Sequence, residues 1–423
     1  MQGVTGFYGW RVVVAAFVVA MFGWGLGFYG PPVFLHAVVL RTGWPVGLVS
    51  AAVTLHFLCG AAVVAMLPQL YRRFGLPRIT LAGSVVLALG LLGWSLALAP
   101  WQLFLAALAS GIGWVTMGAA AINAIIAPWF SRRRPAALAM AYNGASIGGV
   151  VFSPLWVALI TRLDFTGAAL AICAVMLPVM LWLVCGPLAV TPARLGQLPD
   201  GDMPDGDPAR NAAPAAAEPP ALAGRALWRN RHFLTLAAAM ALSLFAQIGL
   251  IAHLFSLLVP AFGAQWAGFA AGLATACAIA GRSAVGWLLP VGADRRLAAS
   301  LSLLVQAAGS LAFILAGGGN VALLLAGVVL FGLGIGNVTS LPPLIAQAEF
   351  ARQTALRVVA LIVALGQAGY AFAPAAFGLL REASTDQTAL FFSAALVIQL
   401  AAIGCFLRGR QRPPGSGPGV TMV

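Results

Sequence analysis

The sequence contains no lysine, and all 23 of its basic residues are arginine. The phosphate-binding loop GxxxxGK[ST] requires a lysine, so this absence excludes ATP-driven transport by the chain alone. Charge of either sign is scarce, because charged residues make up 8% of the chain, against about 25% in soluble globular domains. Hydrophobic residues make up 61%, and the mean hydropathy is +0.98. The sequence therefore indicates a protein whose main solvent is lipid.

The motifs of most enzymes are also missing. There is no HExxH, no acid pair inside an apolar span and no CxxC. The five cysteines lie in apolar spans or at their ends, without a histidine at metal-ligand spacing, and are interpreted as small core residues: Cys59, Cys173, Cys185, Cys277 and Cys405. We therefore expect no enzyme activity, no metal and no cofactor. A membrane receptor or sensor is an alternative, but it should carry a soluble signalling domain.

The chain does contain long apolar runs, and a run of roughly 20 apolar residues can cross a bilayer as a helix. The first run has no clear cleavage site and is interpreted as a retained helix rather than a signal peptide. Twelve runs predict an all-α membrane protein with twelve transmembrane helices, near 10–38, 44–70, 77–99, 101–128, 134–160, 166–188, 232–260, 265–290, 296–316, 321–348, 355–380 and 387–408.

The arginines are distributed unevenly over the turns between these spans. If the N-terminus is cytoplasmic, the cytoplasmic turns and the tail hold 18 arginines and the outer turns hold three. This asymmetry predicts a multi-pass protein of the cytoplasmic membrane with both termini in the cytoplasm. The net charge of +13 then reflects topology, so no nucleic-acid partner is expected. Arg132, Arg133 and Arg134 form the densest group and are predicted topology anchors.

Composition changes abruptly in the middle of the chain. Residues 191–230 are rich in Pro, Gly and Ala and hold five of the ten acidic residues, which predicts a flexible cytoplasmic linker. The linker separates an N-terminal six-helix bundle, 1–190, from a C-terminal bundle, 231–408, and a cytoplasmic tail follows at 409–423. It is also the longest soluble segment, which disfavours a sensor.

The two bundles resemble each other in sequence. GGVVFSP ends at Pro154 and AGYAFAP ends at Pro374, while GIGWVT begins at Gly111 and GIGNVT at Gly334. The matches keep the same order at offsets of 220 and 223 residues. Two pseudo-symmetric six-helix bundles are the architecture of the major facilitator superfamily, in which the binding site lies between the halves near the bilayer midplane.

Two short stretches carry a closer resemblance. PWFSRRRPAALAMAYNGASIGG at 128–149 resembles the helix 4–5 signature of the monocarboxylate transporter and oxalate:formate antiporter branches of this superfamily, and FYGWRVVVAAF at 7–17 is similar to their helix 1 opening. The resemblance implies alternating access, a small organic anion as substrate and an arginine in helix 8 that binds it. The animal monocarboxylate pattern also has an acidic residue before helix 1 and an aspartate in helix 8, and this chain has neither.

Glycines recur four apart inside two spans. Gly144 and Gly148 share one face of the fifth helix, and Gly23 and Gly27 share one face of the first, so other helices can approach closely there. Plain packing is one interpretation. The other is that the fifth helix slides against a helix of the opposite half during alternating access.

Ionisable residues inside a bilayer are costly and usually functional. All ten acidic residues fall in turns, in the linker or at helix ends, so Arg282 in the eighth span has no intramembrane acid as counter-ion. Arg282 could have a structural role by binding backbone carbonyls. Residues Asp294 to Arg296, at the following turn, suit that structural role better. Because a guanidinium stays charged and suits a carboxylate, and because the resembling branches bind substrate at this helix, we predict that Arg282 anchors the substrate.

His56 and His253 are the predicted candidates for carrying a proton, although either one also suits a neutral, hydrogen-bonded core position. Further substrate-binding candidates are polar residues at comparable depth: Tyr142, Asn143, Asn123, Gln247 and Tyr370. The sequence thus predicts a monomeric secondary transporter of a small organic anion, most simply a monocarboxylate, working by proton symport or anion exchange. An exporter of another class of small molecule is the alternative within the superfamily.

Overall fold

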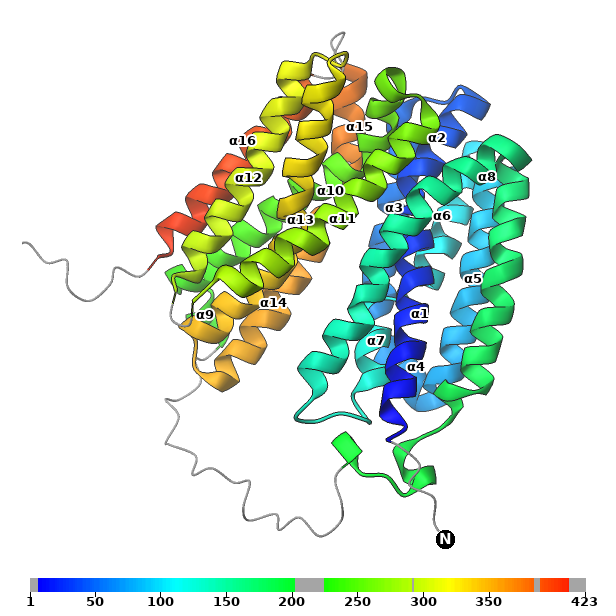
Figure 1. Cartoon of the computed structure of the whole chain (residues 1–423), viewed down its shortest axis with the longest axis vertical. Coiled ribbons are helices and arrows are strands. Elements are labelled where there is room, and N and C mark those ends of the chain that lie inside the picture. The colour runs from blue at the N-terminus through cyan, green and yellow to red at the C-terminus, as the bar shows by residue number, and fades with distance from the viewer. Residues whose placement is uncertain (1–6, 202–223, 291–292, 384–388, 411–423) are drawn as a thin grey trace, which may run out of the picture.

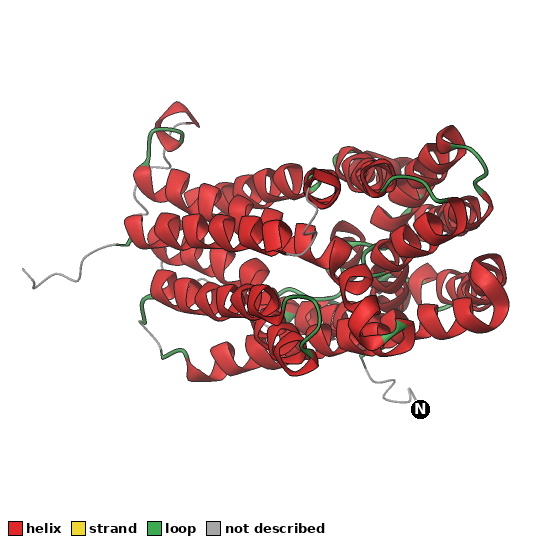
Figure 2. Ribbon diagram, turned by 90° about the horizontal axis from the view of Figure 1, so that it is seen from above, coloured by secondary structure: helices red, strands yellow, loops and turns green. Residues whose placement is uncertain are grey.

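The computed structural model describes residues 7–201, 224–290, 293–383 and 389–410 (Figure 1). Its regular elements within these ranges are helices, with no strand among them (Figure 2). This confirms the predicted all-α class. The N half comprises α1 Gly9–Gly27, α2 Gly30–Thr42, α3 Val46–Val64, α4 Leu67–Phe74, α5 Leu76–Leu96, α6 Pro100–Val115, α7 Ala119–Ile126 and α8 Arg134–Cys185.

The second group of helices follows residues 202–223. A short helix, α9 (Gly224–Leu227), leads into the C half, which comprises α10 Arg231–Phe262, α11 Ala264–Leu288, α12 Arg295–Ala316, α13 Val321–Glu349, α14 Arg352–Tyr370, α15 Ala373–Ala383 and α16 Ala389–Arg408. Figure 1 shows the two halves as separate groups of helices standing side by side.

Eleven helical segments of the described chain are long and apolar enough to cross a membrane. One of them contains two spans, because α8 reverses direction at Asp164, whose φ of 59° and ψ of −178° are not helical. The Asp164 carboxylate accepts a hydrogen bond of 2.8 Å from the Gly167 N–H and so caps the second span. The segments therefore hold the twelve predicted spans.

Several spans contain a break in the helix, and the ranges predicted from the sequence did not include these breaks. α1 gives way to α2 at Phe28 and Tyr29, directly before Gly30, Pro31 and Pro32. Proline has no N–H and cannot continue the hydrogen-bond ladder of the preceding helix. α14 and α15 are likewise separated just before Pro374, at the position that repeats Pro154.

Among the described residues, the contacts that join the halves gather toward one end. The end where the linker lies is called here the linker end, and the opposite end the far end. One buried hydrophobic cluster fills the N half and continues into the C half through Leu254, Phe255 and Phe377. A second cluster, around Phe233 and Phe406, is built from C-half residues and α9 only. The helices of the two halves accordingly converge at the top of Figure 1 and diverge toward the linker.

The predicted division at residues 191–230 stays a prediction, but parts of that segment have defined contacts. Three short 3-10 helices follow α8: Pro187–Ala189, Pro192–Leu195 and Pro199–Gly201. The Asp200 carboxylate accepts hydrogen bonds from the backbone N–H groups of Ser131, Arg132 and Arg133, at 3.1, 2.7 and 3.1 Å. Residues 192–201, called the strap below, therefore dock onto the N half.

Candidate functional site

A small cavity of about 30 Å³ lies between the halves. This volume holds one or two water molecules, so the helices are nearly in contact there. Its polar lining groups are Tyr29, Ser153 and Thr275, and the rest of the lining is apolar. Tyr29 comes from the α1–α2 break of the N half, and its ring and the Thr275 side chain on α11 of the C half both lie against Gly149.

Arg282 lies on α11 about two turns from Thr275, toward the linker end. Its side chain is partly buried, and its Nε is fully buried without a hydrogen-bond partner. None of the ion pairs in the described part of the chain includes it. Gly336 on α13 makes room for the side chain, because a Cβ atom there would lie 3.0 Å from Arg282 Nε. Within the described residues, the Arg282 guanidinium therefore has no hydrogen bond and no ion pair.

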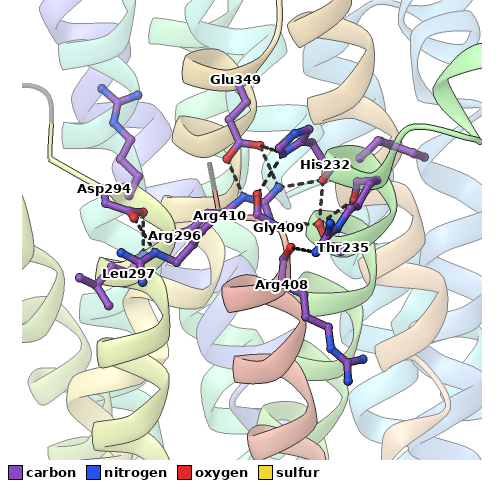
Figure 3. A network of polar contacts seen from close by, with 12 residues as sticks. His232, Thr235, Asp294, Arg296, Leu297, Glu349, Arg408, Gly409 and Arg410 are labelled. Atoms are coloured by element: carbon purple, nitrogen blue, oxygen red, sulfur yellow. Dashed lines mark hydrogen bonds and ion pairs between the residues drawn. The ribbon is translucent and has the colours of Figure 1, made fainter. Parts of the chain in front are cut away.

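Arg296 shows how this protein holds an arginine that serves structure (Figure 3). It is 2% exposed, and its Nε and Nη2 donate to the two carboxylate oxygens of Glu349 at 2.5 and 2.8 Å. Its Nη1 donates to Thr235 Oγ1 at 3.1 Å, and Nη2 also donates to the His232 carbonyl at 2.8 Å. Arg296 therefore fills the structural role that the sequence suggested for Asp294 to Arg296. Arg282 has no equivalent set of contacts among the described residues.

The predicted N-half candidates lie on α7 and α8. Tyr142 accepts a hydrogen bond of 2.6 Å from Asn123 Nδ2 and donates one of 3.1 Å to the Ala119 carbonyl. Asn143 is exposed and shares a helix face with Val150 and Pro154, whose backbone packs against Gly272 and Gly268 of α11. The helix face that meets the C half at the far end therefore carries Asn143 toward the linker end.

The two C-half candidates differ in position. Gln247 is buried inside the C half, where its Oε1 accepts a hydrogen bond of 3.2 Å from Gln306, which also contacts Gln399. Tyr370 is the last residue of α14. Its ring packs edge-to-face on Phe57 of the N half, with the ring centroids 5.9 Å apart. The structure thus places Tyr370 at the interface and Gln247 in an interhelical amide network.

Both histidines are fully buried and hydrogen-bonded through both ring nitrogens. His56 on α3 lies 2.8 Å from Ser110 Oγ and 2.8 Å from the Gly27 carbonyl. His253 on α10 lies 3.0 Å from the Pro374 carbonyl, and its Nδ1 lies 3.3 Å from Arg381 Nη1. A guanidinium only donates, so His253 Nδ1 is the acceptor in that contact.

The glycines face helices of their own half. Gly144 and Gly148 of α8 lie against the backbone carbonyls of Phe17 and Met21 on α1. Gly23 lies against Met117 in the break between α6 and α7, and Gly27 lies against Trp114 at the end of α6. The expected sliding partner in the opposite half is not their neighbour here, because the missing Cβ atoms are filled by N-half backbone and side chains. The packing interpretation describes these contacts.

Sequence reasoning missed Tyr29, Thr275 and Arg381. The signal for Tyr29 was present in FYGPP at 28–32, because Gly-Pro-Pro interrupts a span and exposes the residue before it. Arg381 is one of the three arginines that the predicted topology places in outer turns, yet its Nη1 donates a hydrogen bond of 2.7 Å to Ser256 Oγ. Thr275 had no signal of its own within an apolar helix.

Comparison with known proteins gives the family. Residues 12–374 match the model of the Major Facilitator Superfamily. Curated relatives include monocarboxylate transporter 13 of Bos taurus, 29% identical over 185 residues, and the MFS transporter asaE of Aspergillus flavus, 29% identical over 181 residues. These matches cover 43% and 41% of this chain and only 42% and 39% of the relatives.

Solved structures agree in fold across the chain. The nucleoside transporter NupG matches with a TM-score of 0.69 at 13% identity, covering 95% of this chain and 99% of that one. A bacterial homologue of the human lysosomal transporter Spinster, inward-facing and unoccupied, matches with a TM-score of 0.66 at 14% identity, covering 96% and 99%. At such identity the likeness concerns the fold alone.

Proposed function

Because the chain belongs to the Major Facilitator Superfamily and is a multi-pass membrane transporter, we propose that it moves a small organic anion by alternating access, most simply a monocarboxylate. The observation that carries this proposal is the buried Nε of Arg282, which has no hydrogen-bond partner and lies about two turns along α11 from the cavity between the halves. A substrate carboxylate supplies the two parallel acceptors that a guanidinium fork prefers. The partly apolar surroundings strengthen such a pair because water screens it less.

The cavity lining supports a substrate with an apolar part. Beside Tyr29, Ser153 and Thr275, the cavity is lined by aliphatic and aromatic side chains such as Leu254 and Phe331. A carboxylate held by Arg282 would extend its body toward these groups. A short monocarboxylate combines one charge with one apolar end, and this matches the charge and lining better than a polyol or a cation does.

The positive-inside distribution assigns the linker end to the cytoplasm. With that orientation in the cytoplasmic membrane, the halves meet on the outer side and diverge on the inner side, which is an inward-facing arrangement. Arg282 then lies on the side from which a cytoplasmic anion reaches it. Binding in this state and release to the outside, or the reverse, makes the chain a secondary carrier.

A thermal-shift screen of the purified protein against small carboxylates tests this proposal, because a ligand that binds the folded state raises its stability. We expect at least one monocarboxylate to raise the melting temperature of the wild type and of Arg162→Gln, a surface control at the far end. Arg282→Gln should lose this response. A panel without any stabilising carboxylate, or stabilisation that persists in Arg282→Gln, would favour an exporter of another substrate class.

A further inference from the structure

The far end is held closed by a regular seam between α3 of the N half and α15 of the C half. Four pairs of residues meet along it: Gly47 with Glu382, Ser50 with Gly378, Thr54 with Ala375 and Phe57 with Tyr370. The numbers rise along α3 while they fall along the partner segment, so the two segments run antiparallel. Opening the far end requires these pairs to separate.

The start of α3 receives its cap from the opposite half. The first N–H groups of a helix have no acceptor within the helix. α3 has no side-chain cap of its own, since Pro45 occupies the cap position. The Glu382 carboxylate fills this role by accepting a hydrogen bond of 2.5 Å from the Gly47 N–H. Its negative charge also suits the positive end of the α3 dipole.

The start of α15 is capped in the same way from the other side. α15 begins within the span, after the interruption beyond Tyr370, and its early N–H groups need acceptors there. Thr54 Oγ1 on α3 accepts a hydrogen bond of 3.0 Å from the Ala375 N–H. Each helix of the seam therefore depends on the other half for a cap.

Glycine makes this close approach feasible. A Cβ atom on Gly47 would lie 2.8 Å from Glu382 Oε2, and one on Gly378 would lie 2.5 Å from Ser50 Oγ. Any side chain at either position would push the helices apart or displace the cap. The seam is therefore a contact of specific geometry and not only an apolar contact.

We infer that Thr54 and Glu382 are positioning residues that hold the far end closed by reciprocal helix capping, a contact called the latch below. The charge of Glu382 sets the strength of the latch. Loss of this charge weakens the attraction to the α3 amides and dipole and therefore favours opening. The inference rests on the proposed alternating access but not on the identity of the substrate.

Among the described residues, the other ionisable groups near the seam are engaged elsewhere. The first turn of α3 has no ionisable side chain. Arg381, its neighbour on α15, is turned toward Ser256 and His253 of α10. His36 of α2 packs on Phe255 of α10.

Distances measured between the two halves across the far end test the latch without any substrate. Spin labels at Leu98 and Gly319, exposed in far-end turns of the N and C halves, report its opening in a cysteine-free full-length chain. We expect Thr54→Val, which loses the cap, to raise the far-open population roughly 2- to 30-fold. Glu382→Gln keeps an acceptor but loses the charge, and should raise it roughly 2- to 5-fold. Thr54→Ser retains the hydroxyl and should behave as wild type.

Asp164→Asn is the matched control, because it removes a charge at the same end outside the seam. Asp164→Asn should leave the far-open population at the wild-type level. Unchanged distances in folded Glu382→Gln and Thr54→Val would overturn the latch. A folded Glu382→Gln protein that behaves as wild type while Thr54→Val opens would overturn the role of the charge. If the latch behaves as expected but no carboxylate is transported, only the proposed substrate fails.

Discussion

At the scale of single residues, the two buried histidines differ in whether they can accept a proton. His56 Nε2 lies by the Gly27 carbonyl and therefore donates, while Nδ1 accepts from the Ser110 hydroxyl. If Nδ1 gains a proton, Ser110 can turn its own hydrogen to the Ala107 carbonyl, 3.1 Å away. Every hydrogen bond is then kept. At His253 a second proton would instead face the Arg381 guanidinium.

This difference predicts which histidine matters if uptake is coupled to protons. His56→Gln should abolish the stimulation of uptake by an inward proton gradient while leaving anion exchange measurable. His253→Gln should keep the stimulation, because His253 acts as a fixed acceptor. Uptake into proteoliposomes with and without the gradient measures both, and a loss of stimulation in His253→Gln alone would contradict the assignment.

The sequence identified Arg282 because a charge without an acid inside a span is visible in the sequence alone. It could not separate Gln247 from Tyr370, since both are polar residues at similar depth. Which face of a helix a polar side chain occupies depends on how that helix packs, as the Gln247–Gln306 contact shows. Tyr29 became evident only when the interruption of α1 and α2 brought it to the cavity.

At the scale of elements, the α1–α8 contact depends on glycine. A Cβ atom at Gly148 would collide with the Met21 carbonyl, whereas one at Gly404 on α16 would meet no atom within 4 Å. Gly148→Ala should therefore lower stability by about 1–3 kcal/mol through overpacking, and Gly404→Ala should be neutral or stabilising. Binding and transport should fall together in Gly148→Ala, because the damage is to the N half itself.

Melting temperatures in detergent, measured with substrate binding, check this prediction. A Gly148→Ala protein that is as stable as Gly404→Ala and binds normally, but does not transport, would show that the α1–α8 contact moves during the cycle. That result would restore the sliding interpretation.

The strap provides a pH-dependent contact outside the membrane. Burial raises the pKa of Asp200, but the backbone N–H groups of Arg132, Arg133 and Ser131 outweigh it and hold the pKa below the usual 3.8. A lowered carboxylate pKa stabilises the docked strap at neutral pH, and this contribution disappears as the pH falls through the lowered value.

Asp200→Asn should therefore loosen the strap at pH 7. Hydrogen–deuterium exchange of residues 192–201 should be roughly tenfold faster than in the wild type, as for loss of a charged hydrogen bond. As the pH is lowered below 3.8, corrected wild-type exchange should approach that of the variant. Identical exchange at pH 7 would show that the carboxylate does not hold the strap.

Hydropathy predicted the spans well because length and apolar content are what a bilayer requires of a helix. The interruptions within spans were not predicted. The α1–α2 break follows from Gly-Pro-Pro, which the sequence shows, but the break between α6 and α7 at Thr116–Gly118 has no proline and depends on packing around Gly23. The docking of Asp200 combines residues far apart in the chain, which composition cannot reveal.

At the scale of the whole molecule, the empty carrier must reorient with Arg282 unpaired. Burying an uncompensated charge during occlusion costs several kcal/mol, and a bound anion removes this cost. Exchange of one anion for another should therefore be at least about tenfold faster than net uptake. Counter-substrate inside proteoliposomes measures this ratio. If it does not accelerate uptake while a proton gradient does, proton symport is the better account.

The most direct test of the central claim, that Arg282 pairs with the carboxylate of a transported anion, is the initial rate of uptake of a radiolabelled monocarboxylate into proteoliposomes. The substrate is the one that stabilises the wild type in the thermal screen, and Arg162→Gln serves as the matched control. We predict uptake by the wild type and the control, none by Arg282→Gln and little by Arg282→Lys, because an ammonium lacks the bidentate fork. Undiminished uptake by both folded Arg282 variants would contradict the account.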